Sequence, residues 1–508
     1  MRTLPWSRVW TKHPALVRVA WGLAQAAIAV LLGLWLIGVM TQRGWERVVA
    51  LITQGFTLVI SLVDPLLGLI FWLILAPFAP FWNFDLSMGA GVPDLGLVRT
   101  GTLAVGFVLL AQLAAGRRTL PPLGWTEIGM LIFVGGMLLA TRLALKGMLS
   151  ALQTAFDAYV IPLVVYLFAR ILVTDERRLN WVLNGLIVIV LYIAFLALHE
   201  SWTGVMWFYP WGRAGLYTGS LRRVTTLLGN PVYHTMIMNV MLPVAIYRFV
   251  RSRTWWRAGA YLLLVGLMLT TVIFLYSRAG YLAAFLVMTV MAVRFPRWRR
   301  VYAVGLVVGA LALAVNWGRF TQTELYRYRL SNQVSVEARV RTADVALQLW
   351  RESPIFGIGY PNYGPITLQR GYFVQIDDKW LPAPHNTFFG ILSQAGLIAF
   401  SGYVLMLLGM AREIVSRYRH LRQGVERKVS GLWRSTVGLD TSPHAESGWA
   451  VVALAALVAY VTIISTIDAD PAQFSNLVFY TLIGSILGYM AHTHARHPVP
   501  TSTVGEER

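Results

Sequence analysis

Long apolar runs alternate with short polar connections along almost the whole chain. Most runs are close to the ~20 residues that a helix needs to cross the hydrocarbon core of a bilayer. The candidate spans are residues 17–40, 47–63, 66–82, 97–115, 123–141, 149–173, 179–199, 231–250, 258–276, 278–294, 300–316, 386–410, 448–467 and 473–491. The pattern predicts an all-α polytopic membrane protein with about 12–14 transmembrane helices.

One region of this pattern, residues 47–82, allows two topologies. Asp64 and Pro65 divide it into two short apolar pieces, which form either two short spans or one re-entrant hairpin. Both solutions leave every later loop on the same side. The first apolar run, which begins near residue 17, is longer than the core of a signal peptide, so we expect it to remain as the first span.

Basic residues set the orientation of the spans. Arginine-rich connections occur at residues 117–118, 177–178, 251–257, 294–300 and 412–434, and all fall on one side of the predicted membrane. Short loops rich in Lys and Arg stay in the cytoplasm. We therefore expect both termini in the cytoplasm and the opposite loops outside.

The predicted chain has four parts. These are transmembrane helices with short loops at 1–316, a large outer loop at 317–385, C-terminal transmembrane helices with a basic cytoplasmic loop (412–447) at 386–491, and a cytoplasmic tail at 492–508. Loops longer than about 15 residues are usually functional or have structure of their own. Helical spacing in the outer loop predicts an amphipathic helix on the membrane surface, with its apolar stripe at Val336, Val340, Ala343, Leu347 and Trp350.

Composition narrows the function classes. Only 13% of the 508 residues are charged, whereas soluble proteins have about a quarter. The net charge of +20 would suggest nucleic acid in a soluble protein, but here the basic residues occupy the cytoplasmic loops, so we expect no nucleic-acid partner. The absence of cysteine excludes disulfides and thiol catalysis.

Three polar clusters fall on the predicted outer face. The first joins Arg222 and Arg223 to Gly-Asn-Pro at 229–231. Pro231 suits the first turn of a helix, so Asn230 would cap it. Such a cluster places two cations just outside the start of a span.

The second cluster is Ser-Arg-Ala-Gly at 277–280, and the third is Pro-His-Asn at 384–386. Arg278 lies between two apolar spans with almost no loop, so it must sit at the interface or slightly inside, where ionisable residues are costly and usually functional. His385 and Asn386 close the outer loop and open the next span.

These clusters suggest anion binding and proton transfer. Arg223 and Arg278 can hold a pyrophosphate bidentately, and a neutral His385 can accept a proton from an attacking hydroxyl. Each also has a structural interpretation, because arginines at helix ends extend to lipid phosphates and a histidine there can be a cap. The outer loops carry no metal-ligand spacing. We therefore expect neither metal nor cofactor, and the arginines would neutralise the leaving group.

In this order, the clusters resemble the O-antigen ligase and Wzy-type polymerase superfamily. The resemblance rests on Arg223 with Gly-Asn-Pro (229–231), Ser-Arg-Ala-Gly (277–280), Ser-Pro-Ile-Phe-Gly-Ile-Gly-Tyr (353–360), Pro-His-Asn (384–386) and Gly396. It covers roughly residues 150–410. Ala399 replaces an expected glycine, a departure that concerns helix packing rather than chemistry.

The resemblance implies a GT-C-like, metal-independent, inverting glycosyltransferase. The donor would be a glycan on undecaprenyl pyrophosphate, and the acceptor a hydroxyl of a glycan, lipid or protein on the periplasmic face of a bacterial inner membrane. The resemblance assigns binding of the donor pyrophosphate to Arg223 and Arg278, and the role of general base to His385. The residues that would contact the substrates are Arg222, Asn230, Asn386, Tyr360 and Asn362. We expect a cleft open to the lipid and to the outer face, with the two catalytic arginines at its rim.

Two alternatives stay open. A Wzy-type polymerase would join lipid-linked repeat units, although the outer motifs favour ligase-type transfer. A transporter of lipid-linked glycans or solutes would need carboxylates within the membrane, and Asp157 and Asp64 are candidates. The polar signal, however, lies outside the membrane, and the two halves show no repeat.

Overall fold

The structure is a computed structural model of the chain. It describes residues 45–81, 94, 96–208, 216–218, 221–331, 333–372, 374–376, 379–430, 443–468 and 470–496. The first predicted span, 17–40, and the end of the predicted tail lie outside the described residues. The remaining thirteen predicted spans all coincide with helices.

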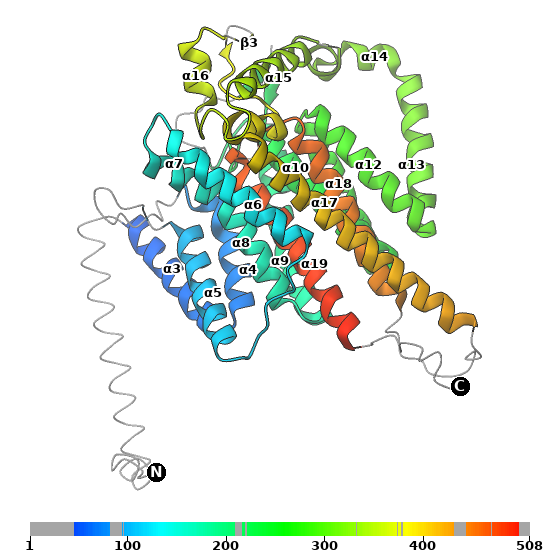
Figure 1. Ribbon diagram of the computed structural model, residues 1–508. Coiled ribbons are helices and arrows are strands. Elements are labelled where there is room, and N and C mark those ends of the chain that lie inside the picture. The colour runs from blue at the N-terminus through cyan, green and yellow to red at the C-terminus, as the bar shows by residue number, and fades with distance from the viewer. Residues whose placement is uncertain are drawn as a thin grey trace, which may run out of the picture.

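The helices of the membrane region run in the predicted order (Figure 1). They are α3 (Trp45–Val63), α4 (Pro65–Leu75) with η1 (Ala76–Phe78), α5 (Leu97–Ala114), α6 (Trp125–Ala140), η2 (Thr141–Leu143), α7 (Met148–Ala155), η3 (Phe156–Val160), α8 (Ile161–Leu172), α9 (Glu176–Thr203), α10 (Pro231–Arg251), α11 (Trp255–Phe274), α12 (Arg278–Arg294), α13 (Pro296–Val315), α17 (Thr387–Ser430), α18 (Pro443–Ile464), η5 (Asp470–Ala472) and α19 (Gln473–Arg496). Within the described part of the chain, nine helices are long and apolar enough to cross a membrane, and the shorter apolar helices Val48–Val63 and Pro65–Phe78 accompany them. The chain is an all-α polytopic membrane protein.

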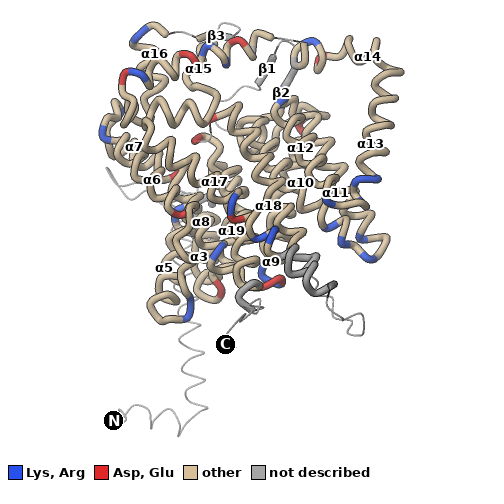
Figure 2. The backbone as a smooth tube through the Cα atoms, turned by 45° about the vertical axis from the view of Figure 1, so that its right-hand side comes forward, with Lys and Arg blue, Asp and Glu red and all other residues tan. Residues whose placement is uncertain are grey.

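The loop between α13 and α17 forms a layer over one end of the bundle, which we call the loop end (Figure 1). It consists of α14 (Trp317–Gln322), η4 (Leu325–Leu330), α15 (Val334–Glu352), α16 (Tyr363–Gln369), β3 (Gln375–Ile376) and β4 (Lys379–Trp380). A second short antiparallel pair, β1 (Leu216–Thr218) and β2 (Leu221–Arg223), precedes α10. We call the opposite end, where Lys and Arg gather at the helix turns, the basic end (Figure 2).

The core lies where α8, α10, α18 and α19 pack together. Side chains around the whole circumference of α10 are buried, whereas α13 at the periphery buries only Trp298 among its side chains. Peripheral helices expose large apolar residues such as Phe107 and Leu263. A helix that is apolar all round belongs in a core or against lipid, so this distribution fits a bundle surrounded by lipid.

The helices α6 and α17 pack closely along much of their length, and small residues make this possible. A Cβ atom on Gly136 would lie 2.7 Å from the backbone nitrogen of Ala399, and one on Gly129 would lie 2.4 Å from that of Met406. Small residues let two backbones approach closely inside a membrane. Ala399 is buried at this contact, which is the packing position that the sequence suggested for it.

The region 47–82 forms two separate helices, α3 and α4, that pack against each other. Asp64 ends the first and caps the second, because its side chain accepts a hydrogen bond from the backbone N–H of Leu66 at 2.8 Å. The other carboxylate oxygen pairs with Arg178 at 3.1 Å, which places the turn at the basic end. With η1, α4 is about 20 Å long, so the second arm is short.

One local prediction is corrected, and a second stays open. The loop expected from residue 412 begins as helix, because α17 continues to Ser430 and is supported there by the (i, i+4) pair of Glu413 and Arg417. The amphipathic helix expected between residues 317 and 385 exists as α15, and Val336 and Val340 of its predicted apolar stripe are exposed. Its buried side chains are Ala338, Thr342, Ala346 and Leu349. The contact of the apolar stripe with the membrane surface stays a prediction.

Candidate functional site

The segment that follows Arg223 is held by a buried carboxylate. Glu200 of α9 accepts hydrogen bonds from the backbone N–H groups of Thr225 at 3.0 Å and Thr226 at 2.8 Å. Arg223 ends β2 and is partly buried, while the side chain of Arg222 lies outside the described residues. The Glu200 anchor therefore fixes where the chain leaves Arg223.

Asn230 caps α10 as predicted, because its side chain accepts from the backbone N–H of Val232 at 2.9 Å. His234, one turn later, is fully buried. Its ring nitrogens lie 2.9 Å from the carbonyl oxygen of Asn230 and 2.6 Å from that of Thr226. Both side chains shape the turn between Arg223 and the helix.

Arg278 is brought beside this segment by an apolar contact, since Val224 clusters with Leu275 at the end of α11. Arg278 is the first residue of α12, and Ser277 caps that helix through the backbone N–H of Gly280. A Cβ atom on Gly280 would lie 2.1 Å from the side chain of Thr235. Glycine thus lets the start of α12 press against α10.

His385 is fixed between α15 and the turn joining α18 to α19. Its backbone N–H donates to a carboxylate oxygen of Asp468 at 3.1 Å, and its Nδ1 lies 3.6 Å from the same oxygen. The preceding carbonyl, of Pro384, accepts from the hydroxyl of Thr342 in α15 at 3.0 Å. The imidazole is partly exposed at 35%, so it remains open to a substrate.

Asn386 has structural partners on both sides. Its side-chain oxygen accepts from the backbone N–H of Phe388 at 2.9 Å, and its amide donates to the carbonyl of Ser465 at 2.8 Å. It caps α17 and ties that helix to α18. The predicted substrate contact of Asn386 stays a prediction, and the arrangement supports the prediction that it orients His385.

Tyr360 and Asn362, predicted at the acceptor cleft, are both buried. The hydroxyl of Tyr360 donates to Asp470 at 3.3 Å. The amide of Asn362 accepts from the backbone N–H of Leu145 at 2.9 Å and donates to the carbonyl of Leu143 at 2.7 Å. These side chains hold the walls of the site together.

The motif 353–360 packs into a break in α17. Gly396 has φ +71°, and the interrupted helix leaves carbonyls that accept from Ile358 N–H (Ser393 O, 3.0 Å) and Gly359 N–H (Gln394 O, 3.0 Å). A Cβ atom on Gly396 would lie 2.2 Å from the carbonyl oxygen of Ile355. The glycines therefore dock the outer loop onto the helix that begins just after His385.

Arg339, which the sequence analysis missed, is a further cation at this site. It lies on α15, where burial and the nearby positive charge of Arg278 lower its pKa. Arg339 in turn acts on His385, whose pKa falls to about 4 because of burial and this charge. Arg278 and His385 thus belong to one electrostatic cluster.

Asp468 was also missed. Burial and the neighbouring carboxylate of Asp470 raise its pKa well above the usual range of a carboxyl group. Both residues lie in the turn between α18 and α19, at the loop end. The reasoning that singled out Arg278, an ionisable group in a very short turn between apolar spans, would have found them.

A cavity of about 450 Å³ adjoins the His385 segment. The residues lining it include Lys146, Tyr363, Trp380, Gln394, Asp468 and Asp470. The indole N–H of Trp380 is buried, and no described residue accepts a hydrogen bond from it. Aromatic faces and polar groups together suit a sugar ring. Arg223 and Arg278 do not line this cavity, so the predicted rim of arginines around a shared cleft stays a prediction.

A non-glycine residue in the left-handed region lies in or beside each of the three predicted clusters. These are Leu227 (φ 57°), Tyr276 (φ 51°) and His385 (φ 51°). Such conformations cost of order 1–3 kcal/mol and gather at active sites. His385 is itself a predicted residue, whereas Leu227 and Tyr276 adjoin the predicted ones.

The two carboxylates that favoured a transporter have structural partners. Asp157 in η3 pairs with Arg99 near the start of α5, with an Nε–Oδ1 distance of 2.8 Å. Asp64 caps α4 and pairs with Arg178. Among the described residues, no group of three His, Asp or Glu side chains could hold a metal ion.

Comparison with known families finds one match. Residues 263–404 match the O-antigen ligase family. The matched segment runs from α11 into α17 and includes Arg278, Arg339 and His385, whereas Arg223 and Asp468 lie outside it. A search among curated proteins found no match.

Proposed function

We infer that this chain, a membrane protein whose residues 263–404 form an O-antigen ligase domain, transfers a glycan from undecaprenyl pyrophosphate to an acceptor hydroxyl. The observation that carries the proposal is the electrostatic cluster at the loop end. His385 lies 3.6 Å from Asp468 and interacts with Arg339, which interacts with Arg278. The loop end would face the periplasm or outside of a bacterial inner membrane, with both termini in the cytoplasm.

Donor binding would fall to the arginines. The positive charge of Arg278 lowers the pKa of Arg339, so an anion between them would relieve like-charge repulsion. Arg223, on the adjacent anchored segment, would add a third guanidinium. Planar guanidinium groups match the paired oxygens of a pyrophosphate, and they would stabilise the charge that develops as it leaves.

Acceptor activation would fall to His385. Its lowered pKa keeps the imidazole neutral at neutral pH, as a base must be. With Nδ1 facing Asp468, Nε2 would take the proton of the acceptor hydroxyl while the acceptor oxygen bonds to the anomeric carbon. The bond from that carbon to the pyrophosphate breaks, and the electron pair leaves with the phosphate oxygen. Attack opposite the leaving group inverts the anomeric centre.

The 450 Å³ cavity would receive the acceptor. Trp380 offers a ring face and an unused N–H donor, and Gln394 offers an amide. Asp468 lines the cavity and also contacts His385, so the acceptor would lie next to the base. Buried Tyr360, bonded to Asp470, would fix the floor.

A Wzy-type polymerase is the second candidate, because a polymerase and a ligase would use the same lipid-linked donor and the same kind of acceptor hydroxyl.

A transporter is less favoured, because Asp157 and Asp64 are neutralised by arginines at the two ends of the bundle. Neither carboxylate is left for ion coupling.

The test is reconstituted transfer. The purified full chain is incubated with lipid-linked glycan, with and without a separate acceptor, and products are identified by mass spectrometry. Ligase activity gives glycosylated acceptor and free polyprenyl pyrophosphate in equal amounts. Longer lipid-linked chains without added acceptor would instead assign the polymerase, and an unchanged donor under both conditions would refute glycosyl transfer.

A further inference from the structure

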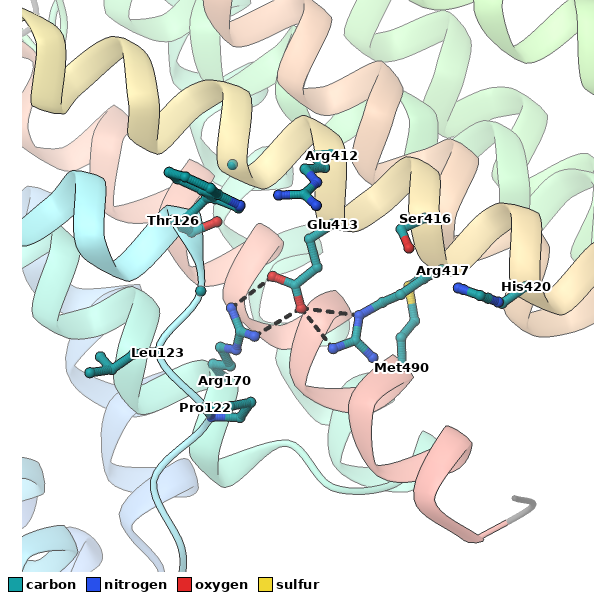
Figure 3. Close-up of a pocket in the computed structure, with 13 residues that line it drawn as sticks. Pro122, Leu123, Thr126, Arg170, Arg412, Glu413, Ser416, Arg417, His420 and Met490 are labelled. Atoms are coloured by element: carbon teal, nitrogen blue, oxygen red, sulfur yellow. Dashed lines mark hydrogen bonds and ion pairs between the residues drawn. The ribbon is translucent and has the colours of Figure 1, made fainter. Parts of the chain in front are cut away.

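A second polar site lies at the basic end, far along α17 from His385. A cavity of about 510 Å³ opens between α6, α8, α17 and α19, and Figure 3 shows the side chains that line it. A neighbouring cavity of about 630 Å³ lies along the same stretch of α17. The two share Arg412, Ser416 and His420.

The floor of the first cavity is a closed ion-pair network. Arg170, only 4% exposed, pairs with Glu127 at 2.7 Å and with Glu413 at 2.8 Å. Glu413 also pairs with Arg417 at 2.7 Å, and Figure 3 shows its carboxylate between the two guanidinium groups. Two cations balance two anions here, so the network fixes the floor without attracting a ligand of either sign.

The walls carry the unbalanced charge. Arg412 and Arg419 are exposed on α17, and no carboxylate among the described residues forms an ion pair with either. Ser416 and His420 follow Arg412 at intervals of four residues, which puts these three on one helix face. Arg412 also lies over the ring of Trp125, 5.8 Å from its centroid. The site therefore combines donors and positive charge in a concave surface.

Exposed apolar groups border this charge on the surface of the bundle. Leu123 (72%), Trp125 (51%) and Leu408 (62%) expose much of their surface beside the cavities. A soluble anion would gain nothing from them, whereas a lipid would cover them with acyl chains. Basic pockets between transmembrane helices are suited to anionic lipid headgroups.

We propose that Arg412, Arg419, Ser416 and His420 bind the headgroup phosphate of one anionic phospholipid. The phosphate lies between the two guanidinium groups, Ser416 donates to it, and the acyl chains run along Leu408 and Trp125. The bilayer thereby holds the long helix α17 at the end opposite His385. This site is independent of the glycan chemistry.

The test uses the purified full chain, delipidated in a neutral detergent and titrated with phosphatidylglycerol while bound lipid is counted by native mass spectrometry. One lipid is expected to bind tightly. Each arginine near an anionic lipid contributes about fivefold in affinity, so R412Q/R419Q should weaken binding about 25-fold. The control R299Q/R300Q removes two exposed arginines at the start of α13 and should bind as the wild type does.

Two further measurements test whether a lipid headgroup or free phosphate is bound, and whether the space shared by the two cavities is the binding site. Phosphatidylcholine and inorganic phosphate should each bind far more weakly than phosphatidylglycerol. Ser416→Phe fills the space that both cavities share without changing charge, and it should also abolish tight binding. Unchanged affinity in R412Q/R419Q, an equal loss in the control, or equally tight binding of phosphatidylcholine or inorganic phosphate would each overturn the proposal.

Discussion

The two ends of the bundle both gather charged groups, but they do so in opposite ways. At the basic end, Arg170 meets two carboxylates at 2.7 and 2.8 Å, and the pairs are closed. At the loop end, Arg278 and Arg339 act on each other as like charges, and His385 stands 3.6 Å from Asp468. The first arrangement joins opposite charges in pairs, whereas the second places two like charges close together beside an imidazole and a carboxyl group.

The difference distinguishes charged groups that hold helices together from charged groups that are suited to catalysis. A buried pair with ideal geometry holds helices together, and removing one partner exposes the other. Perturbed pKa values beside a cavity are instead typical of catalytic groups. Both patterns are rich in arginine, so residue type alone does not tell them apart.

The largest expected effect is on catalysis at the loop end. Replacing His385 by Ala removes the proposed base, so we expect transfer to fall about 100- to 10,000-fold. Donor binding should stay near the wild-type level, because the arginines remain. Single-turnover transfer and equilibrium binding of the lipid-linked donor measure the two effects. A variant with the wild-type rate across pH would remove His385 from the mechanism.

The matching change at the basic end should act on stability instead. Arg170→Ala leaves Glu127 and Glu413 without their shared cation in a buried position, which costs about 3–5 kcal/mol. We expect a lower melting temperature in detergent and less folded protein. Transfer per folded molecule should be nearly unchanged. If the rate per folded molecule fell as far as in His385→Ala, the division between the two ends would be wrong.

A smaller effect on transfer is expected when a guanidinium group is replaced by an ammonium group of the same charge. Arg278→Lys replaces a planar fork by a point charge, and hydrogen bonds to charged groups contribute about 1.5–3 kcal/mol. We expect kcat/KM to fall about 10- to 100-fold, mainly through weaker donor binding. Arg300→Lys, an exposed cation at the start of α13, is the control and should have no effect. Equal activity of both variants would argue against bidentate recognition.

Periodicity and loop charge predicted the membrane fold well, because an apolar run of fixed length has few alternatives in a bilayer. The ordered motifs likewise selected Arg278 and His385, which lie in one electrostatic cluster. The sequence did not reveal which side chains of α15 pack against the bundle. Its small buried residues pack by close approach, whereas the exposed Val336 and Val340 dominate any hydrophobicity pattern.

Two members of the cluster escaped sequence reasoning for a different reason. Arg339 and Asp468 come from segments separated from His385 by 46 and 83 residues, and only the fold brings them together. Asn362 is buried and donates a hydrogen bond to the carbonyl of Leu143, a structural contact that its place near the motif did not reveal, and its predicted contact with the acceptor stays a prediction. Spacing identifies local motifs, but charge partners depend on tertiary contacts.

The smallest expected effect is a pH dependence in which the transfer rate rises with pH while the stability of the fold falls. Burial and Asp470 raise the pKa of Asp468 well above the usual range of a carboxyl group, so raising the pH above neutral converts its carboxyl group to a carboxylate. The new negative charge beside Nδ1 favours protonation of His385, so transfer should accelerate. Stability should move the other way. A carboxyl whose pKa is about 3.9 in the unfolded chain and higher in the fold stabilises the protein below pH 4, and this contribution is lost as the pH rises through the folded pKa. Asp468→Asn should abolish both trends while keeping an acceptor for the backbone N–H of His385. Rates and melting temperatures between pH 6 and 9 test this, and a wild-type profile that matches the Asn variant would show that Asp468 only positions the loop.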